Sequence, residues 1–172
     1  MNDLPFDLAR TDTQQLMLYR ERLRDLAHQL RVAGPQHFHQ ASWFVGDPDG
    51  DGEDPNLDHA TPTSEIASFD VHNCGASACL AGHGAIVMTR SRTPIGSTMD
   101  KYDVSEYFGL PLDWFAGDLG PGHPHFEMYD QLLRSTVPTS IAQFTCQLVG
   151  ISDVIRSIHH EIARRRATTT TP

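Results

Sequence analysis

The clearest pattern in the chain is an amphipathic repeat near its start. Between residues 13 and 32, large apolar side chains recur at steps of three and four, at Leu16, Tyr19, Leu23, Leu26 and Leu30. Side chains at this spacing share one face of an α-helix, so the pattern predicts a helix that buries one stripe. Thr11 and Asp12 are available as N-caps, and Gly34-Pro35 is expected to end the helix.

Weaker patterns predict further helices. One runs from about Ser77 to Thr89 and is rich in small residues, and a short one with the capping-box spacing Asp103 to Glu106 ends at Gly109. A final pair is predicted to begin at Thr139 or Ser140 and again at Ser152 or Asp153. Such a pair would suit a helix-turn-helix, but its second helix lacks the basic residues of a recognition helix.

Together these patterns predict an all-α or α-dominated fold, with about five helices around one core and long irregular loops. Residues 1–166 are expected to form a single domain that carries an acidic loop insertion at 46–64. The threonine-rich tail, residues 167–172, is expected to be disordered.

Composition narrows the classes of function. The chain has 172 residues, of which 39% are hydrophobic, and a formal charge of −9. This charge disfavours nucleic acid as a partner, because phosphate groups are also negative. Membrane association is not expected, since no stretch approaches the roughly 18 apolar residues of a membrane span.

With no signal-peptide pattern and three cysteines, the chain is predicted to be cytoplasmic with reduced thiols. The arginines of the first and last helices are interpreted as solvated faces.

Cysteine and histidine cluster in one twelve-residue stretch. His72, Cys74, Cys79 and His83 supply the nitrogen and sulfur ligands that zinc prefers. Their spacing matches no common zinc motif, and free cysteine is among the most often buried residue types, so packing is the favoured interpretation. A third alternative is a cysteine-dependent hydrolase, in which Cys74 at a helix N-terminus would act as a nucleophile.

A second cluster lies in the acidic loop. Asp47, Asp49, Asp51 and Asp58 fall at positions 1, 3, 5 and 12 of a calcium-loop pattern. Asp54 stands where such loops place an apolar residue, so the favoured interpretation is a solvated loop without a bound cation. His123 and His125 could in principle reach one metal ion, but an exposed loop is the simpler expectation for them.

Three segments carry a resemblance to a known family. Phe38 to Trp43, Cys74-Gly75 through Cys79-Leu80-Ala81-Gly82-His83, and Phe108-Gly109-Leu110 match blocks of the family. On these residues, which cover most of 14–115, the chain resembles a family of small bacterial and bacteriophage proteins of uncharacterised function. The family places Trp at the position of His83. The resemblance therefore implies that His83 packs in the core.

The sequence thus favours a non-enzymatic accessory or protein-interaction domain of bacterial or phage origin. Its expected partner is another protein, and no cofactor is expected. The alternatives are a Cys/His metal-binding protein, with zinc or calcium as the ion, and a hydrolase that uses Cys74. The oligomeric state is left open.

Overall fold

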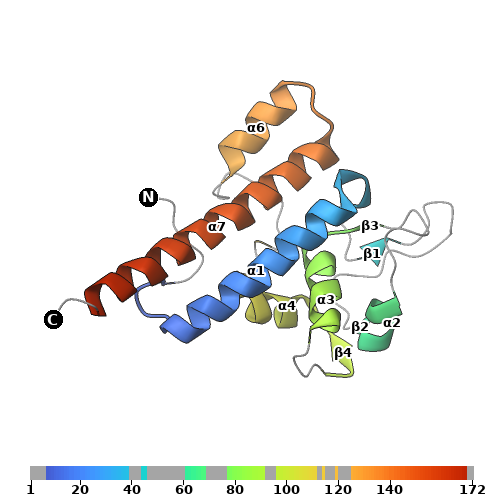
Figure 1. Cartoon of the computed structure of the whole chain (residues 1–172). Coiled ribbons are helices and arrows are strands. Elements are labelled where there is room, and N and C mark those ends of the chain that lie inside the picture. Colours follow the sequence, from blue (N-terminus) through green and yellow to red (C-terminus); the bar gives the residue numbers. More distant parts are fainter. Residues whose placement is uncertain are drawn as a thin grey trace.

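The computed structural model describes residues 7–38, 44–45, 61–68, 77–91, 96–111, 114, 119 and 125–169. Helices dominate this part of the chain, as predicted (Figure 1). The helices are α1 (Thr13–Ala33), a 3-10 turn η1 (Pro35–His37), α2 (Thr63–Ser68), α3 (Leu80–Arg90), α4 (Lys101–Phe108), α6 (Phe126–Arg134) and α7 (Thr139–Thr169). The strands are β1 (Phe44–Val45), β2 (Thr61–Pro62), β3 (Ser77–Ala78) and β4 (Thr98–Met99).

The first helix has the predicted boundaries. Asp12 caps its start, because its carboxylate accepts hydrogen bonds from the backbone N–H groups of Gln14 and Gln15. Gly34 ends the helix at a φ of 77°, a conformation that glycine adopts without steric cost. Four leucines of the predicted stripe are wholly buried, and each contributes about 2 kcal/mol by leaving water: Leu16, Leu23, Leu26 and Leu30.

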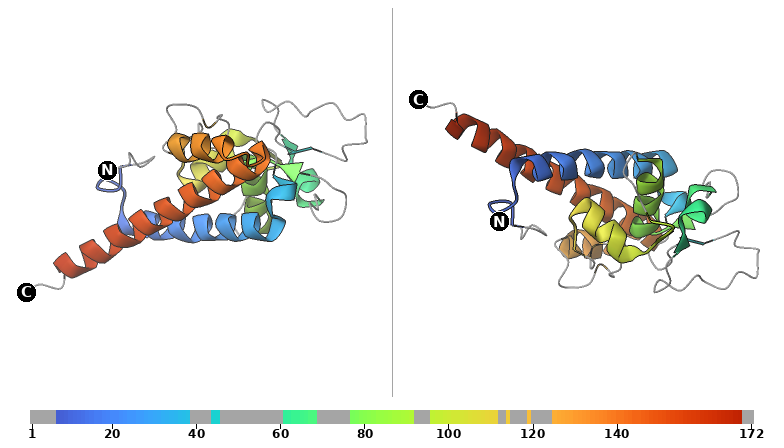
Figure 2. Two further views of the ribbon diagram at one scale, coloured as in Figure 1. Left: turned by 90° about the horizontal axis from the view of Figure 1, so that it is seen from above. Right: turned by 90° about the horizontal axis from the view of Figure 1, so that it is seen from below.

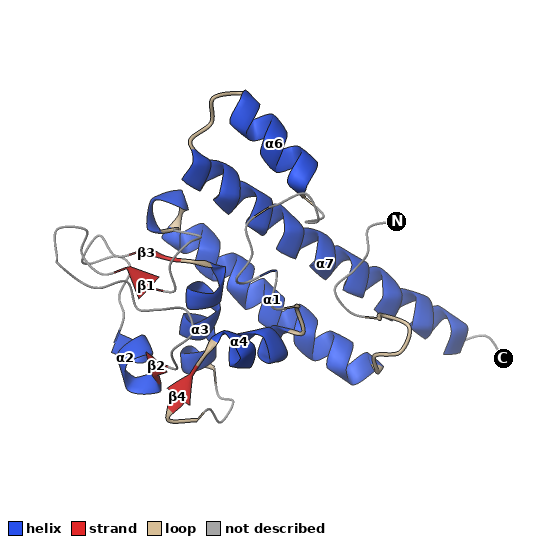
Figure 3. Cartoon of the chain, turned by 180° about the vertical axis from the view of Figure 1, so that it is seen from behind, coloured by secondary structure: helices blue, strands red, loops and turns tan. Residues whose placement is uncertain are grey.

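The longest helix, α7, packs along α1. The two run side by side and cross at an angle in both views of Figure 2. The buried face of α7 includes residues at steps of three and four, which meet the leucine stripe in the core: Ile151, Val154, Ile158 and Ile162. On the other side of α1, α3 and α4 complete the core (Figure 3).

The predicted final pair of helices is wrong, because α7 is one continuous helix. Ser152 lies in its interior, where its hydroxyl donates to the carbonyl oxygen of Leu148 at 2.7 Å instead of capping a new helix. A helix-turn-helix at this position is therefore contradicted. The helix also continues to Thr169, so the first three residues of the expected tail are helical.

Two other boundaries differ from the prediction, and one helix was not predicted. The helix expected from Ser77 begins at Leu80, because Ser77 and Ala78 pair with β1 as a short antiparallel strand. The capping box of α4 is formed by Asp100 and Asp103, three residues earlier than predicted. The helix α6 was not predicted at all, and Figure 1 shows it lying over the first half of α7.

Strand pairing in the described residues consists of two short antiparallel ladders and one isolated parallel bridge between Phe38 and Ala78. β1 pairs with β3, and β2 pairs with β4. The second ladder places Thr98 and Met99 just before α4.

Candidate functional site

The structure places Cys79 in the core rather than at an open site. It is the N-cap residue of α3, is wholly buried and is not part of a disulfide. Burial raises the pKa of the Cys79 thiol to about 11, because the desolvated thiolate is disfavoured. Cys79 is therefore a neutral thiol near pH 7, as packing requires. His72 and Cys74 lie outside the described residues.

His83 is also a wholly buried residue with a structural role. Its Nε2 lies 3.0 Å from the carbonyl oxygen of His37, so Nε2 carries the proton and donates it. The ring stacks on Phe38, with centroids 6.1 Å apart and planes 5° apart. His83 thus ties α3 to η1. Binding of a metal at Nε2 would require loss of this hydrogen bond.

The other predicted ligands are not brought together in the described part of the chain. Asp47, Asp49, Asp51 and Asp58 lie outside it, as does His123. Within the residues that the structure describes, no group of three or more His, Cys, Asp or Glu side chains is placed to hold a metal ion.

His125, by contrast, is described and is almost fully buried. It is the N-cap residue of α6, and its ring packs edge-on against Trp114, with centroids 6.3 Å apart. Gly150 of α7 allows this packing, because a Cβ there would lie 3.0 Å from Cδ2 of His125. Burial lowers the pKa of His125, and the negative charge of Asp153 partly opposes that shift. His125 is therefore a packing residue that joins α6 to α7, not a member of an exposed loop.

A groove of about 420 Å³ opens between α1 and α4. Its volume is within the range of ligand-binding pockets. Leu18, Tyr19 and Arg22 form the α1 wall, and the β4 segment closes one side. Met88 and Met99 are buried residues that also line the groove.

The α4 wall of the groove is acidic. Asp103 and Glu106 are exposed and lie three residues apart, so they are neighbours on one face of α4. Asp103 Oδ2 also accepts the backbone N–H of Asp100 at 2.9 Å, which fixes its position as part of the capping box.

Arg22 of α1 connects the two walls of the groove through its contacts with Tyr107 of α4. Its Nη1 donates to the carbonyl oxygen of Tyr107 at 2.6 Å, and its guanidinium carbon lies 3.8 Å from the centroid of the Tyr107 ring. The acceptor is in the last turn of α4, where the helix dipole favours a cation. Arg22 was interpreted as part of a solvated face, and this is wrong, because the side chain is half-buried between α1 and α4.

Close packing fixes the distance between the same two helices. Gly109 ends α4 in the left-handed region at a φ of 68°, and the ring of Tyr19 lies directly over it. A Cβ at this position would lie 2.6 Å from the ring, so only glycine allows this approach. The groove is therefore held open by a rigid pair of helices.

Sequence reasoning missed this groove. A signal was present, because Gln15, Leu18, Tyr19 and Arg22 recur at steps of three, one and three, as a second stripe beside the buried leucines. Leu18 is the informative residue, since it is apolar and lies off the core stripe.

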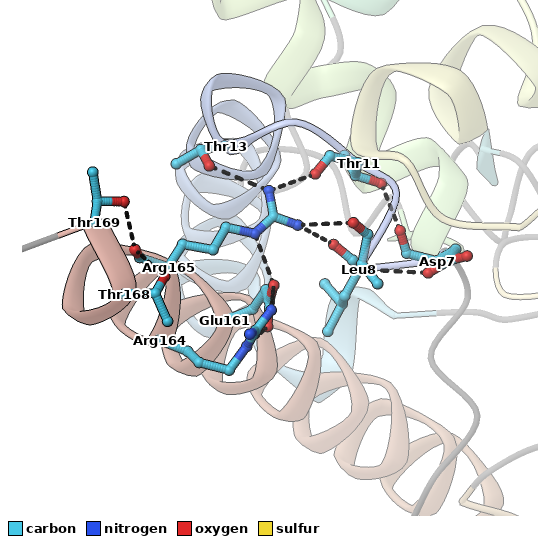
Figure 4. Close-up of polar contacts among 10 residues, drawn as sticks. Asp7, Leu8, Thr11, Thr13, Glu161, Arg164, Arg165, Thr168 and Thr169 are labelled. Atoms are coloured by element: carbon cyan, nitrogen blue, oxygen red, sulfur yellow. Dashed lines mark hydrogen bonds and ion pairs between the residues drawn. The ribbon is translucent and has the colours of Figure 1, made fainter. Parts of the chain in front are cut away.

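At the start of α1, the helix α7 holds the segment that precedes α1. Arg165 of α7 donates to the carbonyl oxygens of Leu8 and Thr11, and also bonds the carboxylate of Glu161 (Figure 4). Arg165 was interpreted as part of a solvated face, and this is wrong, because its side chain is only 21% exposed. These bonds join the two ends of the described chain.

None of the described helices is long and apolar enough to cross a membrane. Comparison of the chain with protein-family models, with curated proteins and with solved structures found no match.

Proposed function

We propose that this chain is a non-enzymatic protein-interaction domain of bacterial or phage origin, and that it binds its partner protein in the groove between α1 and α4. The observation that carries the proposal is the groove itself. It combines an exposed leucine, two methionines and an acidic wall on a pair of helices held at a fixed distance.

The apolar residues of the groove suit a partner's side chain. Leu18 is 42% exposed and lines the groove, so its side chain is accessible to a partner. Met88 and Met99 line the groove but are nearly fully buried, and methionine side chains can adapt their shape to a side chain that packs against them. Binding would remove Leu18 from water, which favours association.

The polar groups of the groove are held in place by structural bonds. Arg22 is engaged by Tyr107, and Asp103 by the capping box of α4. Groups fixed in this way give a surface its shape and charge, which is the requirement for recognition. The metal-binding alternative is weakened, because Cys79 and His83 both pack in the core.

The test is a selection of random twelve-residue peptides displayed on phage, carried out on the whole chain. Peptides enriched on the wild-type protein are then measured against Leu18→Ser. Loss of one leucine contact of about 1–2 kcal/mol corresponds to an affinity about five- to thirtyfold weaker.

The matched control is Leu133→Ser on α6, because Leu133 is 37% exposed and lies away from the groove. We expect it to bind the selected peptides as the wild type does. Equal binding by all three proteins, or a selection that enriches no peptide, would contradict the proposed function.

A further inference from the structure

The charges around the groove are unequal. Asp103 and Glu106 stand exposed on the α4 wall, and the hydrogen bond from the Asp100 amide does not neutralise the Asp103 carboxylate. The only cationic side chain lining the groove in the described residues is that of Arg22. The whole chain, at −9, has the same sign as the acidic wall.

Arg22 offsets only one of the two carboxylates, and part of its guanidinium is engaged by α4. One guanidinium nitrogen is bonded to the Tyr107 carbonyl, the group lies over the Tyr107 ring, and Nε is buried without an acceptor in the described part of the chain. An anionic ligand would therefore face two carboxylates and one cation, so the charged side chains of the groove repel it on balance. A cation, by contrast, would be attracted by both carboxylates.

The dimensions of the groove limit the length of its occupant. Its α1 wall runs from Gln15 to Arg22, seven residues along the helix. At 1.5 Å per residue, this wall is about 10 Å long, which equals about three residues of extended chain.

We propose that the occupant is an extended segment of the partner protein, about three residues long, with large aliphatic side chains on both sides of a Lys or Arg. The aliphatic side chains contact Leu18, Met88 and Met99, and the cation lies beside Asp103 and Glu106. This inference rests on the proposed function and adds to it the chemistry of the partner.

The experiment uses the whole chain with ¹³C-labelled methionine methyl groups, followed by NMR. Three blocked peptides serve as probes: Gly-Leu-Arg-Leu-Gly, Gly-Leu-Gln-Leu-Gly and Gly-Leu-Glu-Leu-Gly. The methyl signals of Met88 and Met99 report on the groove, and Met128 on α6 is the internal control. We expect the arginine peptide to shift Met88 and Met99 at the lowest concentration, then the glutamine peptide, then the glutamate peptide, with Met128 unchanged.

The matched variants are Glu106→Gln and Glu106→Lys, since Glu106 is exposed and neither change removes a packed side chain. We expect Glu106→Gln to weaken the arginine peptide about two- to fivefold, as for an exposed ion pair. Glu106→Lys should reverse the ranking of the arginine and glutamate peptides.

The outcomes separate the two proposals. If all three peptides shift Met88 and Met99 equally, or the glutamate peptide binds best, the groove binds partners but the proposal that the partner segment carries a Lys or Arg is wrong. If none of the three probe peptides shifts these signals while peptides selected on phage do, the proposed aliphatic and cationic side chains of the partner segment are wrong. If neither kind of peptide shifts them, the proposed function fails as well.

Discussion

Arg165, near the end of the last helix, donates a 2.7 Å hydrogen bond to the backbone carbonyl oxygen of Thr11, just before the first helix begins. The same guanidinium bonds the carbonyl oxygens of Leu8 and Ala9 and the hydroxyl of Thr13. One side chain thus satisfies several backbone acceptors of a segment that has no repeating structure of its own. These bonds also hold the start of α1 against the end of α7.

Replacing Arg165 by alanine should destabilise the chain by about 1–3 kcal/mol, because several hydrogen bonds to a charged group are lost at a partly buried position. The matched control is Arg164→Ala, since Arg164 pairs with the same Glu161 but its side chain is 64% exposed. That change should cost no more than about 0.5–1 kcal/mol. Urea unfolding of both variants is the measurement. Equal losses would show that the bonds to the 7–13 segment are unimportant for stability.

Glu161 should make stability depend on acidic pH. Hydrogen bonds from Arg164 and Arg165 lower its pKa from 4.5 to about 2. The folded state therefore favours the ionised carboxylate, and this contribution is complete above about pH 4.5 and is lost as the pH falls through about 2. The stability difference between wild type and Glu161→Gln should shrink over that range. A difference that stays constant there would contradict the assigned ion pairs.

His125 should make stability depend on pH in a higher range, below about 6.5. Burial lowers its pKa below 6.5, so the folded state favours the neutral ring, while the unfolded chain takes up the proton first. Stability is then complete above about pH 6.5 and falls as the pH drops through that value toward the lower folded pKa. In His125→Asn this part of the pH dependence should be absent. The measurement is denaturant unfolding of the wild type and of His125→Asn at a series of pH values. The free energy of unfolding should fall more steeply below about pH 6.5 in the wild type, and parallel curves would contradict the prediction.

Gly109→Ala should both strain the backbone and displace Tyr19. A left-handed conformation costs alanine about 1 kcal/mol, and the clash with the ring adds to this. We expect a total loss of about 1–3 kcal/mol. Gly96→Ala is the comparison, because its Cβ would lie 3.3 Å from one backbone oxygen and its φ is not positive. Thermal unfolding in which the two variants lose stability equally would argue against the Tyr19 contact.

The sequence predicted the elements whose signals are local. The boundaries of α1 follow from Asp12 and Gly34, and the end of α4 follows from Gly109. The start of α3 could not be placed, because the pairing of Ser77 with Val45 depends on a distant segment.

The division of α7 into two helices had a clear physical cause. Ser152 was predicted to cap a new helix, but Ser152 and the nearby Gly150 are both accommodated inside α7. The glycine allows His125 to approach, and the serine bonds back to Leu148. Such compensation depends on tertiary packing, which is not visible in a local pattern.

The groove was hidden for a related reason. Its walls come from α1 and α4, which are distant in sequence. Arg22 was interpreted as part of a solvated face, and Glu106 as part of a capping box. The packing of Tyr19 on Gly109 brings them together, and no spacing rule predicts that contact.

The most direct measurement of the central claim is a crystal structure of the whole chain with a peptide selected on it. The account predicts that the peptide lies along the α1 wall, with an aliphatic side chain against Leu18 and a basic side chain beside Glu106. A competing apolar surface exists on α6 and α7, where Leu133, Ile141 and Val149 are exposed. A peptide bound there, with the groove between α1 and α4 unoccupied, would contradict the account.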